Sequence, residues 1–319
     1  MRELAAHAEH VYTCTQRDSA VANSSIVASW RRCIAMHRLA PEQMRAPIRL
    51  SVQELKRARE VSEKLIADAS AELDRLFTTV GKSGCCLILT DHNGVALERR
   101  GLAGDDNHFH ELGLWTGSVW TEASIGTNGI GTAIADERSV TILRDQHFFS
   151  SNINLSCTTA PIRDHRGHLA AALDISTCRD EINEITLGIL GQMVRDAALR
   201  IEINLFRSAF TGARFVMVPA ANNPTAALLA VDRHDLVIGA TRAARLALQL
   251  DDRRISAGLP AADALQEQSV AADEDLVEAE RAALVRALSR SSGNVSQAAV
   301  ALGMSRATLH RKMKRLNLH

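Results

Sequence analysis

The sequence predicts an α+β fold for about the first two hundred residues and an all-α module at the C-terminus. Two strand-forming runs, Cys85–Glu98 and Cys157–Ser176, are each divided by turn residues, Asn93-Gly94 in the first and Asp164 to Gly167 in the second. Apolar residues at three-and-four spacing on both sides of these hairpins indicate helices. Beyond Glu280 the chain has basic side chains and no acidic one, so its end forms a separate basic unit.

Composition limits the class of protein. A chain of 319 residues fits two or three domains, and a hydrophobic fraction of 46% supports real cores. Lys plus Arg equals Asp plus Glu at 37 each, so net charge identifies no partner. No run of eighteen apolar residues and no signal peptide occur, so we expect a cytoplasmic protein with no membrane partner. The cysteines have no paired spacing and are expected to be free thiols: Cys14, Cys33, Cys85, Cys86, Cys157 and Cys178.

The first fifty residues are predicted to be a helical segment. Ser24–His37 carries Ile26, Val27, Trp30 and Ile34 at helical spacing. Two prolines then interrupt the chain. Ser51 and Glu54 form a capping box that opens a long helix towards Val80, which we expect to supply a dimer contact.

Residues 51–207 are predicted to form one α+β domain, an antiparallel sheet with flanking helices. Gly113–Thr132 is expected to be a loop that leads into a short helix over Gly129–Ala135, and Val140–Leu143 is expected to be a strand. A helix is expected over Glu181–Arg207, with its apolar side formed by Ile182, Ile185, Ile189, Met193 and Leu199.

Residues 208–272 are predicted to be a short connecting segment. Pro219–Pro224 and Gly258–Asp273 have the composition of linkers. Between them, Leu228–Val231, Val237-Ile238 and a helix over Thr241–Leu250 indicate a small α/β fragment. Ala226–Leu250, with Leu229–Asp232 and Gly239–Arg245, resembles the opening strands and first helix of a PAS domain. The rest of that fold is missing, so the resemblance implies a PAS-like remnant.

Residues 273–319 are predicted to form three helices, Leu276–Leu288, Val295–Leu302 and Thr308–Leu316. Gly303 supplies the permissive turn residue, and Ser305 stands where an N-cap belongs. We expect an inward set of Val295, Ala299, Leu302, Leu309, Met313 and Leu316. The outward set on the last helix is Arg306, His310, Arg311, Lys314 and Arg315, which suits a recognition helix that contacts bases and phosphates.

The stretch from Gly293 to Lys314, GNVSQAAVALGMSRATLHRKMK, resembles the Fis-type helix-turn-helix that ends NtrC-type activators. The resemblance implies a homodimer on double-stranded DNA with a near-palindromic operator, and a dimer contact through Leu276–Leu288. The residues expected to contact DNA are Asn294, Ser296, Ser305, Arg306, Thr308, His310, Arg311 and Lys314. The alternative left open is an ordinary basic helical hairpin used for packing.

Several motifs ahead of this module resemble the GAF domain of the acetoin and dihydroxyacetone regulator group: Ser29–Cys33, Trp120–Glu122, Gly126–Thr132, Glu137, His147-Phe148, Cys157–Ile162 and Leu173–Ser176. The resemblance implies a sensor for a small molecule or a protein rather than a catalyst. The polar residues expected to line its pocket are Trp120, Glu122, Thr127, Asn128, His147, Cys157 and Asp174. The alternative is that these side chains brace loops.

Full-length relatives carry a central AAA+ ATPase that acts on polymerase holding the alternative sigma factor. This chain has no Walker A sequence, since Gly81-Lys82-Ser83 is preceded by Leu76 where that motif needs glycine. The resemblance therefore implies action by repression, by recruiting ordinary RNA polymerase or by competing with full-length relatives. No catalytic motif, cofactor motif or zinc spacing is found, so we expect no enzyme, no cofactor and no metal. A rival interpretation is a signalling adaptor that dimerises through its C-terminal helices.

Overall fold

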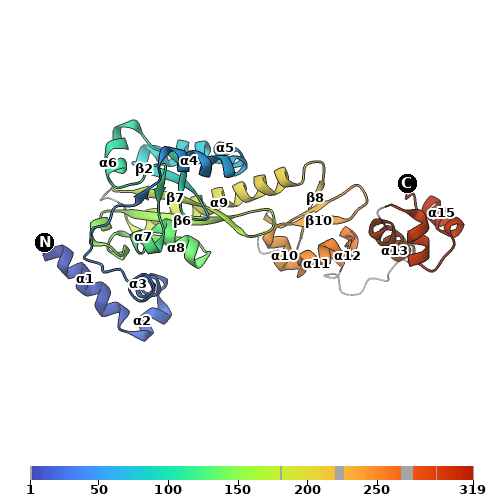
Figure 1. Ribbon diagram of the computed structural model, residues 1–319, viewed down its shortest axis with the longest axis horizontal. Coiled ribbons are helices and arrows are strands. Elements are labelled where there is room, and N and C mark those ends of the chain that lie inside the picture. Colours follow the sequence, from blue (N-terminus) through green and yellow to red (C-terminus); the bar gives the residue numbers. More distant parts are fainter. Residues whose placement is uncertain (1, 180–181, 220–225, 267–275, 292, 319) are drawn as a thin grey trace. The chain divides into compact units, whose positions relative to one another are not determined.

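The structure is a computed structural model that describes residues 2–179, 182–219, 226–266, 276–291 and 293–318. Packing divides it into two compact units, one of residues 1–164 and 168–205 and the other of residues 165–167 and 206–319. Figure 1 labels the elements in chain order. The helices of the first unit are α1 (Arg2–Thr15), α2 (Asp18–Asn23), α3 (Ser25–Ala35), α4 (Val52–Val61), α5 (Glu63–Val80), α6 (Asp106–Glu111), α7 (Glu122–Ile125), α8 (Gly129–Asp136) and α9 (Glu184–Ala209).

A five-stranded antiparallel sheet forms the centre of the first unit, in the order β3-β2-β7-β6-β5. Its strands are β2 (Cys85–Asp91), β3 (Ala96–Arg100), β5 (Val140–Leu143), β6 (Ser156–Arg163) and β7 (Leu169–Thr177). Both predicted hairpins and the predicted strand β5 are confirmed. At the first turn Asp91 Oδ1 accepts hydrogen bonds from the backbone of Asn93 and Val95, and Gly94 has φ +77°.

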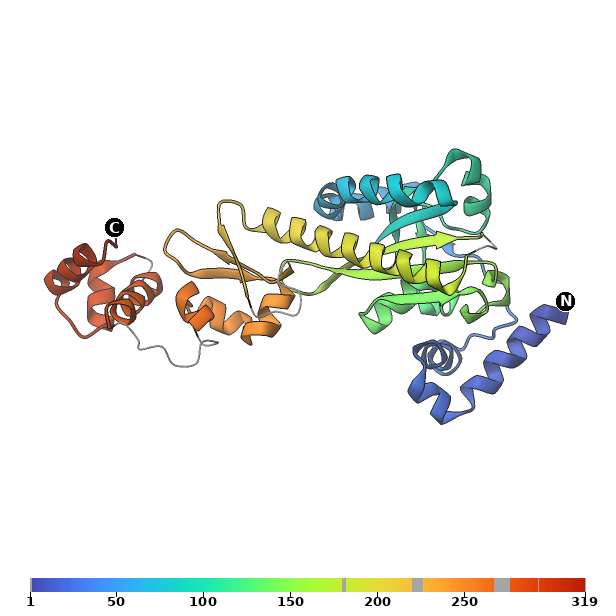
Figure 2. The ribbon, with the colours of Figure 1, turned by 180° about the vertical axis from the view of Figure 1, so that it is seen from behind.

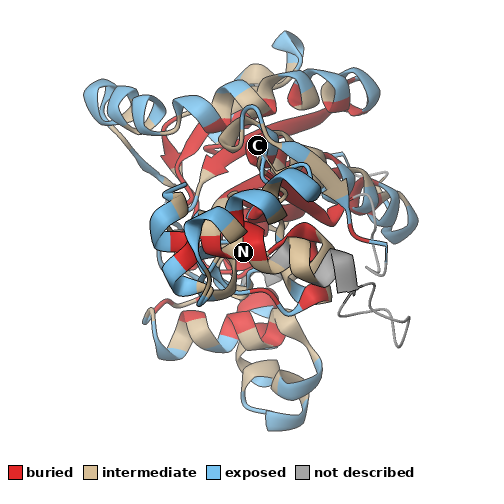
Figure 3. Cartoon of the chain, turned by 90° about the vertical axis from the view of Figure 1, so that its right-hand side faces the viewer, coloured by how far each residue is buried: buried red, intermediate tan, exposed pale blue. Residues whose placement is uncertain are grey.

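The two faces of the sheet pack against different helices, because successive side chains of a strand point to opposite sides. Leu87 and Leu89 of β2 lie in a core shared with α5 and α9. Cys86 and Ile88 lie in a second core together with residues of α1 and α3. Figure 2 shows α9 running along the first face, and in Figure 3 the strands are mostly buried while the helices carry exposed residues along one side. The N-terminal helices therefore share the hydrophobic core of the sheet.

Two predictions about the long helices need correction. The capping box of Ser51 and Glu54 is confirmed, but the predicted single helix is two helices, because Ser62 between them has non-helical φ −98° and ψ 13°. On α9 the predicted apolar side is wrong for Ile185 and Ile189, which are 76% and 59% exposed, whereas Met193 of the predicted set packs against the core. The buried stripe is offset by about two residues and consists of Leu187, Leu190, Val194, Ala197, Ile201 and Leu205.

The predicted loop Gly113–Thr132 contains regular structure before α8. It holds strand β4 (Ser118–Val119), which pairs with β1 (Ile48–Arg49), and the one-turn helix α7, which Thr121 caps. Elements this short leave no periodic apolar pattern, which explains why the sequence indicated only a loop. The predicted helix of Ser24–His37 is confirmed as α3, and α1 and α2 lie within the first fifty residues that were predicted to be helical, although no bounds were predicted for them.

The second unit begins with a three-stranded antiparallel sheet in the order β10-β9-β8. Its elements are β8 (Arg214–Met217), β9 (Leu228–Val231), β10 (Val237–Ala240), α10 (Arg242–Leu248), α11 (Asp252–Ser256) and α12 (Ala261–Gln266). These elements enclose a core of their own around Leu229, Val231 and Ala244, so the PAS-like segment is folded. Its described residues hold this small sheet and no ATPase domain. The predicted second linker is wrong where α12 lies, and most of the first predicted linker falls outside the described residues.

The chain ends in three helices, α13 (Leu276–Arg290), α14 (Val295–Ala301) and α15 (Arg306–Arg315). Leu284, Ala298, Ala299, Leu309 and Leu316 are buried together, with Val295, Leu302 and Met313 packed against them. All three predicted helices and the predicted inward set are thus confirmed. Within the described residues no helix is both long and apolar enough to cross a bilayer.

Candidate DNA interface and sensor site

Helix α15 presents one continuous polar face. Arg306, His310, Arg311 and Lys314 are all exposed, and at 100° per residue they span an arc of about 140°. The opposite side of the helix carries the buried Leu309 and the partly buried Met313. Packing of that apolar side against α13 and α14 fixes the orientation of the basic face, which can meet phosphates and base edges at the same time.

The other predicted DNA contacts lie at helix N-termini, where Asn294 and Ser305 are the N-caps and Ser296 and Thr308 belong to the first turns. Ser305 Oγ accepts a hydrogen bond from the backbone nitrogen of Thr308 at 3.1 Å, and the two hydroxyls are 2.9 Å apart. Asn294 Oδ1 accepts from the backbone of Ser296 and Gln297 at 3.0 and 3.2 Å. Asn294, Ser296 and Ser305 nevertheless remain exposed. The structure thus brings the eight predicted residues to the N-terminal ends of α14 and α15 and along the outer face of α15.

Two basic residues of α15 point to its own domain instead. Lys312 and Arg315 both pair with Glu280 of α13. The hydrogen bond from Lys312 lowers the pKa of the Glu280 carboxyl first, and the charge of Arg315 adds to the effect. Sequence reasoning missed Glu280, although it is the last acidic residue before the basic stretch. Arg315, which was predicted to belong to the outward set, therefore pairs within its own domain, although its side chain is 61% exposed.

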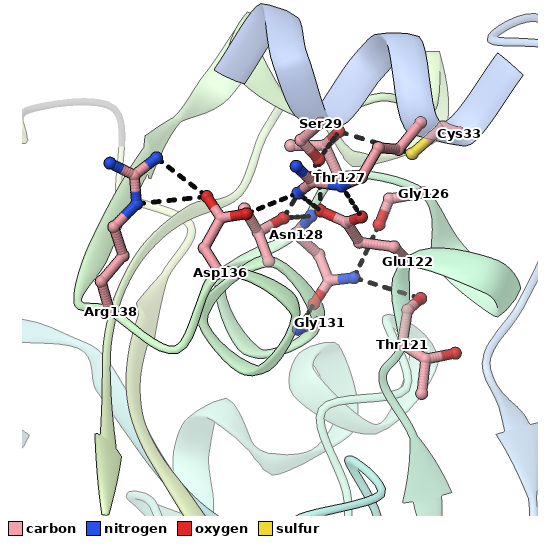
Figure 4. Close-up of polar contacts among 12 residues, drawn as sticks. Ser29, Cys33, Thr121, Glu122, Gly126, Thr127, Asn128, Gly131, Asp136 and Arg138 are labelled. Carbon is pink, nitrogen blue, oxygen red and sulfur yellow. Dashed lines mark hydrogen bonds and ion pairs between the residues drawn. The ribbon is translucent and has the colours of Figure 1, made fainter. Parts of the chain in front are cut away.

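In the first unit, Glu122 and Thr127 belong to a buried polar network with α3 (Figure 4). Arg32 binds the Glu122 carboxylate with both nitrogens of one guanidinium edge, Nε to Oε2 at 2.9 Å and Nη2 to Oε1 at 2.7 Å. Arg32 Nη2 also lies 2.8 Å from Asp136 Oδ1. Ser29 Oγ donates to Glu122 Oε1 at 2.5 Å and lies 2.7 Å from Thr127 Oγ1.

Sequence reasoning assigned no role to Ser29, Arg32 and Asp136, although the motif Ser29–Cys33 contains two of them. Asn128 lies beside this network and caps α8. Its Oδ1 accepts from Gly131 N at 2.8 Å, and its Nδ2 donates to the carbonyl of Gly126 at 2.8 Å. These contacts fix the loop between α7 and α8.

A second buried polar group lies on the sheet. Asp174 on β7 accepts hydrogen bonds from Thr159 and Ser176, both at 2.5 Å. His147 Nε2 lies 3.2 Å from Cys157 Sγ, and its Nδ1 lies 2.9 Å from the carbonyl of Arg144. Burial raises the pKa of Asp174 to about 6 and lowers the pKa of His147 to about 4. Burial, followed by the nearby Asp174 charge, raises the pKa of the Cys157 thiol.

Gly129 allows α8 to approach this group. A Cβ atom there would lie 2.4 Å from Thr159 Oγ1 and 2.8 Å from Asp174 Oδ1. Trp120 lies apart from the group, and its Nε1 donates to the carbonyl of Gly113 at 3.0 Å. The seven predicted pocket residues therefore fall into the α3 network, the sheet group and the isolated Trp120. All seven are buried and hydrogen-bonded to protein atoms.

Two family models match separate parts of the chain. Residues 65–201 match the GAF domain, and residues 276–316 match the Fis family of bacterial regulatory proteins. The first match contains the five-stranded sheet with α5 to α8 and most of α9, and the second contains α13 to α15.

Two of the curated relatives to which this chain is similar are named as regulators of acetoin genes. The acetoin catabolism regulatory protein of Cupriavidus necator is 31% identical over 257 residues, which cover 76% of this chain and 38% of the relative. The acetoin dehydrogenase operon transcriptional activator AcoR of Bacillus subtilis is 28% identical over 159 residues, which cover 50% of this chain and 26% of the relative. The chain thus spans well under half the length of these two relatives.

One solved structure supports the fold. The crystal structure of the E. coli DhaR(N)-DhaL complex contains a chain similar to this one with a TM-score of 0.50 and 17% sequence identity. The similarity covers 72% of this chain and 79% of that chain. At this level of identity the comparison concerns the fold alone.

Proposed function

Because this chain joins a GAF domain to a Fis-family helix-turn-helix and is homologous to acetoin catabolism regulators, we propose that it is a sequence-specific DNA-binding transcription regulator controlled through its GAF domain. The observation that carries the proposal is the exposed basic face of α15. In helix-turn-helix proteins the second helix of the motif lies in the major groove, with its first residues at the base edges. Arg306 stands at that position, and Arg311 and Lys314 follow along the helix to meet phosphates.

The proposed DNA-binding form is a homodimer on a near-palindromic operator. Two recognition helices then enter successive major grooves about 34 Å apart. Exposed apolar residues on two helices of the first unit support self-association. Val52 and Val61 of α4 are 86% and 84% exposed, and Ile185 and Ile189 of α9 are 76% and 59% exposed.

The GAF domain is proposed to receive a small-molecule or protein signal, with Trp120, Glu122, Thr127, Asn128, His147, Cys157 and Asp174 as its candidate binding residues. A ligand that displaced the hydrogen bonds of these buried groups would change how α8 and the sheet pack. Helix α9 packs on the same sheet through Leu187, Leu190 and Val194, so a shift of the sheet would reach it. The signal is proposed to alter the dimer through α9 and thereby set operator affinity.

Regulation is proposed to proceed without ATPase-driven activation of the alternative sigma factor. Along the sequence, the strands of residues 214–240 follow the GAF domain and precede the DNA-binding helices. Three routes remain for such a regulator: repression, recruitment of ordinary RNA polymerase, and competition with full-length relatives for operators. Transcription from the regulated promoter in the presence and absence of the protein separates the first two routes by sign.

A salt titration of DNA binding tests the proposal. Purified protein is titrated against the DNA upstream of its own gene and against a scrambled duplex of equal length, from about 50 to 200 mM salt. We expect tighter binding to the native duplex, with an affinity that falls steeply as salt rises. Equal and feeble binding to the native and scrambled duplexes, together with no enriched sites in genome-wide crosslinking, would reject a DNA-binding regulator in favour of an adaptor.

A further inference from the structure

Arg99 on β3 holds a buried guanidinium that the protein only partly satisfies. The side chain is 9% exposed, and its Nη1 lies 2.7 Å from Asp106 Oδ1 on α6. Its Nε and Nη2 are buried and have no hydrogen-bond partner among the described residues. Leaving charged donors buried and unpaired is costly, and such groups are rare in native proteins. Two such donors on one side chain therefore require an explanation.

The two unpaired nitrogens belong to the same edge of the guanidinium. Their N–H bonds run parallel, so this edge matches an acceptor with two oxygens in one plane. Arg32 in the same domain uses the corresponding edge, Nε and Nη2, to bind both oxygens of the Glu122 carboxylate. At Arg99 none of the described residues brings a carboxylate to that edge, because Asp106 meets only Nη1.

The surroundings of the guanidinium are apolar and close. The ring centroid of Trp115 lies 4.4 Å from Arg99 Cζ, and that of Phe109 lies 5.6 Å from it. Gly101 also packs against it, since a Cβ there would lie 2.3 Å from Nη2. The thiol of Cys86 also contacts Arg99. Burial raises the pKa of that thiol to about 12 and outweighs the charge and the hydrogen bond of Arg99, which lower it, so the thiol adds no counter-charge. An anion at this edge would be shielded from water by aromatic rings.

We propose that the Nε–Nη2 edge of Arg99 binds the carboxylate of a small organic acid. This inference rests on the proposed sensor role of the GAF domain and names the chemical class of its effector. Both nitrogens are fully buried, and α6 contributes Asp106 and Phe109 to the guanidinium, so the acid gains access when α6 shifts. A bound acid brings a second negative charge close to Asp106. The repulsion between the two carboxylates weakens the ion pair between Arg99 and Asp106 of α6.

The test is calorimetric titration of the full chain with acetate, pyruvate, lactate and benzoate, each followed by thermal unfolding in the same acid. Acetamide serves as the neutral counterpart of acetate, and inorganic phosphate as a tetrahedral anion. We expect at least one carboxylate to bind and to raise Tm, while acetamide and phosphate do neither. Arg99→Lys keeps the charge but loses the paired donors, and we expect it to weaken carboxylate binding at least about tenfold.

Arg100→Gln is the matched control, because Arg100 is the next residue on β3 and is already paired with Asp74 and Glu98. It should bind the same acid within about twofold of the wild type. Failure of every carboxylate to bind, binding of phosphate alone, or binding unaffected by Arg99→Lys would overturn the proposal.

A second variant decides the matter if Arg99→Lys fails to fold. Asp106→Asn removes the negative charge that opposes the acid, so carboxylate affinity should rise several-fold, and an unchanged affinity would overturn the proposal. DNA binding measured without any acid is independent of this result. Loss of carboxylate binding with intact operator binding would reject the effector class and leave the regulator function standing.

Discussion

Arg32 joins α3 to α7 through Glu122, with Nε 2.9 Å from Oε2 and Nη2 2.7 Å from Oε1. The Glu122 side chain is 3% exposed and that of Arg32 is 29% exposed. The hydrogen bonding of Arg32 to the Glu122 carboxylate is the largest contribution that raises the pKa of Arg32. The N-terminal helices are therefore held to the sensor domain by charge as well as by their shared apolar core.

Removing Arg32 should destabilise the protein strongly. Arg32→Ala leaves the buried Glu122 carboxylate without its counter-charge, so we expect the free energy of unfolding to fall by about 3 kcal/mol. Urea denaturation measures the change. The matched control is Arg31→Ala, since the partner of Arg31 is Asp18, which is 88% exposed, and such a pair contributes about 1 kcal/mol or less. Equal losses in the two variants would contradict a special role for the Arg32–Glu122 pair.

Replacing two basic residues of α15 should abolish specific DNA binding without unfolding the domain. Both Arg306 and Arg311 are exposed, so Arg306→Ala with Arg311→Ala removes no packing. We expect the affinity for the native operator to fall at least about tenfold and the salt dependence to become shallower by about one unit of slope per lost phosphate contact. Fluorescence anisotropy at several salt concentrations checks both quantities.

The control for that experiment removes two exposed arginines elsewhere. Arg57→Ala with Arg253→Ala also removes two arginines, so the net charge changes by the same amount. Arg57 is exposed on α4 and Arg253 is exposed on α11, so neither substitution removes packing. This variant should bind the operator almost as the wild type does. If both double variants lose the same affinity, the effect is one of overall charge and α15 is not the reading helix.

Two buried groups on the sheet should give stability opposite dependences on pH. The pKa of Asp174 is raised from 3.8 to about 6, so its stabilising contribution is complete below about pH 4 and is lost as pH rises through 6. The pKa of His147 is lowered from 6.5 to about 4, so its contribution is complete above pH 6.5 and is lost as pH falls through 4. Their effects offset each other in the wild-type protein.

Single variants separate these two contributions. Relative to the wild type, Asp174→Asn should gain stability as pH rises from 4 to 6, and His147→Gln should gain stability as pH falls from 6.5 to 4. Each relative change should approach about 3 kcal/mol over its window, since one pKa unit corresponds to about 1.4 kcal/mol. Urea unfolding at half-unit pH steps gives both curves, and parallel curves for wild type and variants would show that neither group titrates as described.

A methyl group at Gly129 should disturb the sheet group, while one at Gly188 should not. The added Cβ at Gly129 would meet Thr159 and Asp174 closer than van der Waals contact allows, so Gly129→Ala should cost about 1–3 kcal/mol. Gly188 lies inside α9 with nothing within 4 Å of the added atom. Gly188→Ala should therefore stabilise the protein by about 0.5–1 kcal/mol. Thermal unfolding of both variants should show shifts of Tm with opposite sign.

The exposed isoleucines of α9 should contribute to self-association. Ile185→Ser with Ile189→Ser removes apolar surface that is mostly exposed, so the fold should be retained. We expect the molar mass from sedimentation equilibrium to fall towards that of one chain, and operator affinity to fall with it. Leu246→Ser, at a residue that is 69% exposed on α10, is the control and should leave the mass unchanged. A mass unaffected by the α9 variant would exclude this helix from the dimer contact.

The sequence predicted the elements that follow local rules. Asn93-Gly94 fixed a hairpin turn, Ser51 with Glu54 fixed a helix start, and Ser305 marked the N-cap of α15, because each acts through neighbours within four residues. The orientation of α9 could not be predicted in the same way. Both of its sides carry aliphatic residues at helical spacing, and only the sheet decides which side is buried.

The sequence predicted which polar residues belong to the candidate site, but it did not predict which of them lie next to one another. Polar residues such as Glu122 and Asp174 were singled out, but they lie in separate groups, because the strand register places Asp174 beside Thr159 while α3 reaches Glu122. The partner residues Arg32 and Glu280 are separated from their contacts by 90 and about 30 positions. No local pattern signals such pairs, and only the folded chain brings them together.

The ion pairs of Arg32 also determine which residues must be transferred together when the sensor domain moves to another protein. The GAF match of residues 65–201 includes Glu122 and Asp136 but leaves out Ser29, Trp30 and Arg32. Trp30 adds a hydrogen bond from Nε1 to the carbonyl of Gln146 at 2.9 Å. A sensor transplanted into another regulator at the boundaries of that match would carry the buried Glu122 carboxylate with no cation, would leave Asp136 paired with Arg138 alone, and would have an uncovered apolar surface. Recombination between regulators can therefore move this sensor intact only when the exchange point lies upstream of α3.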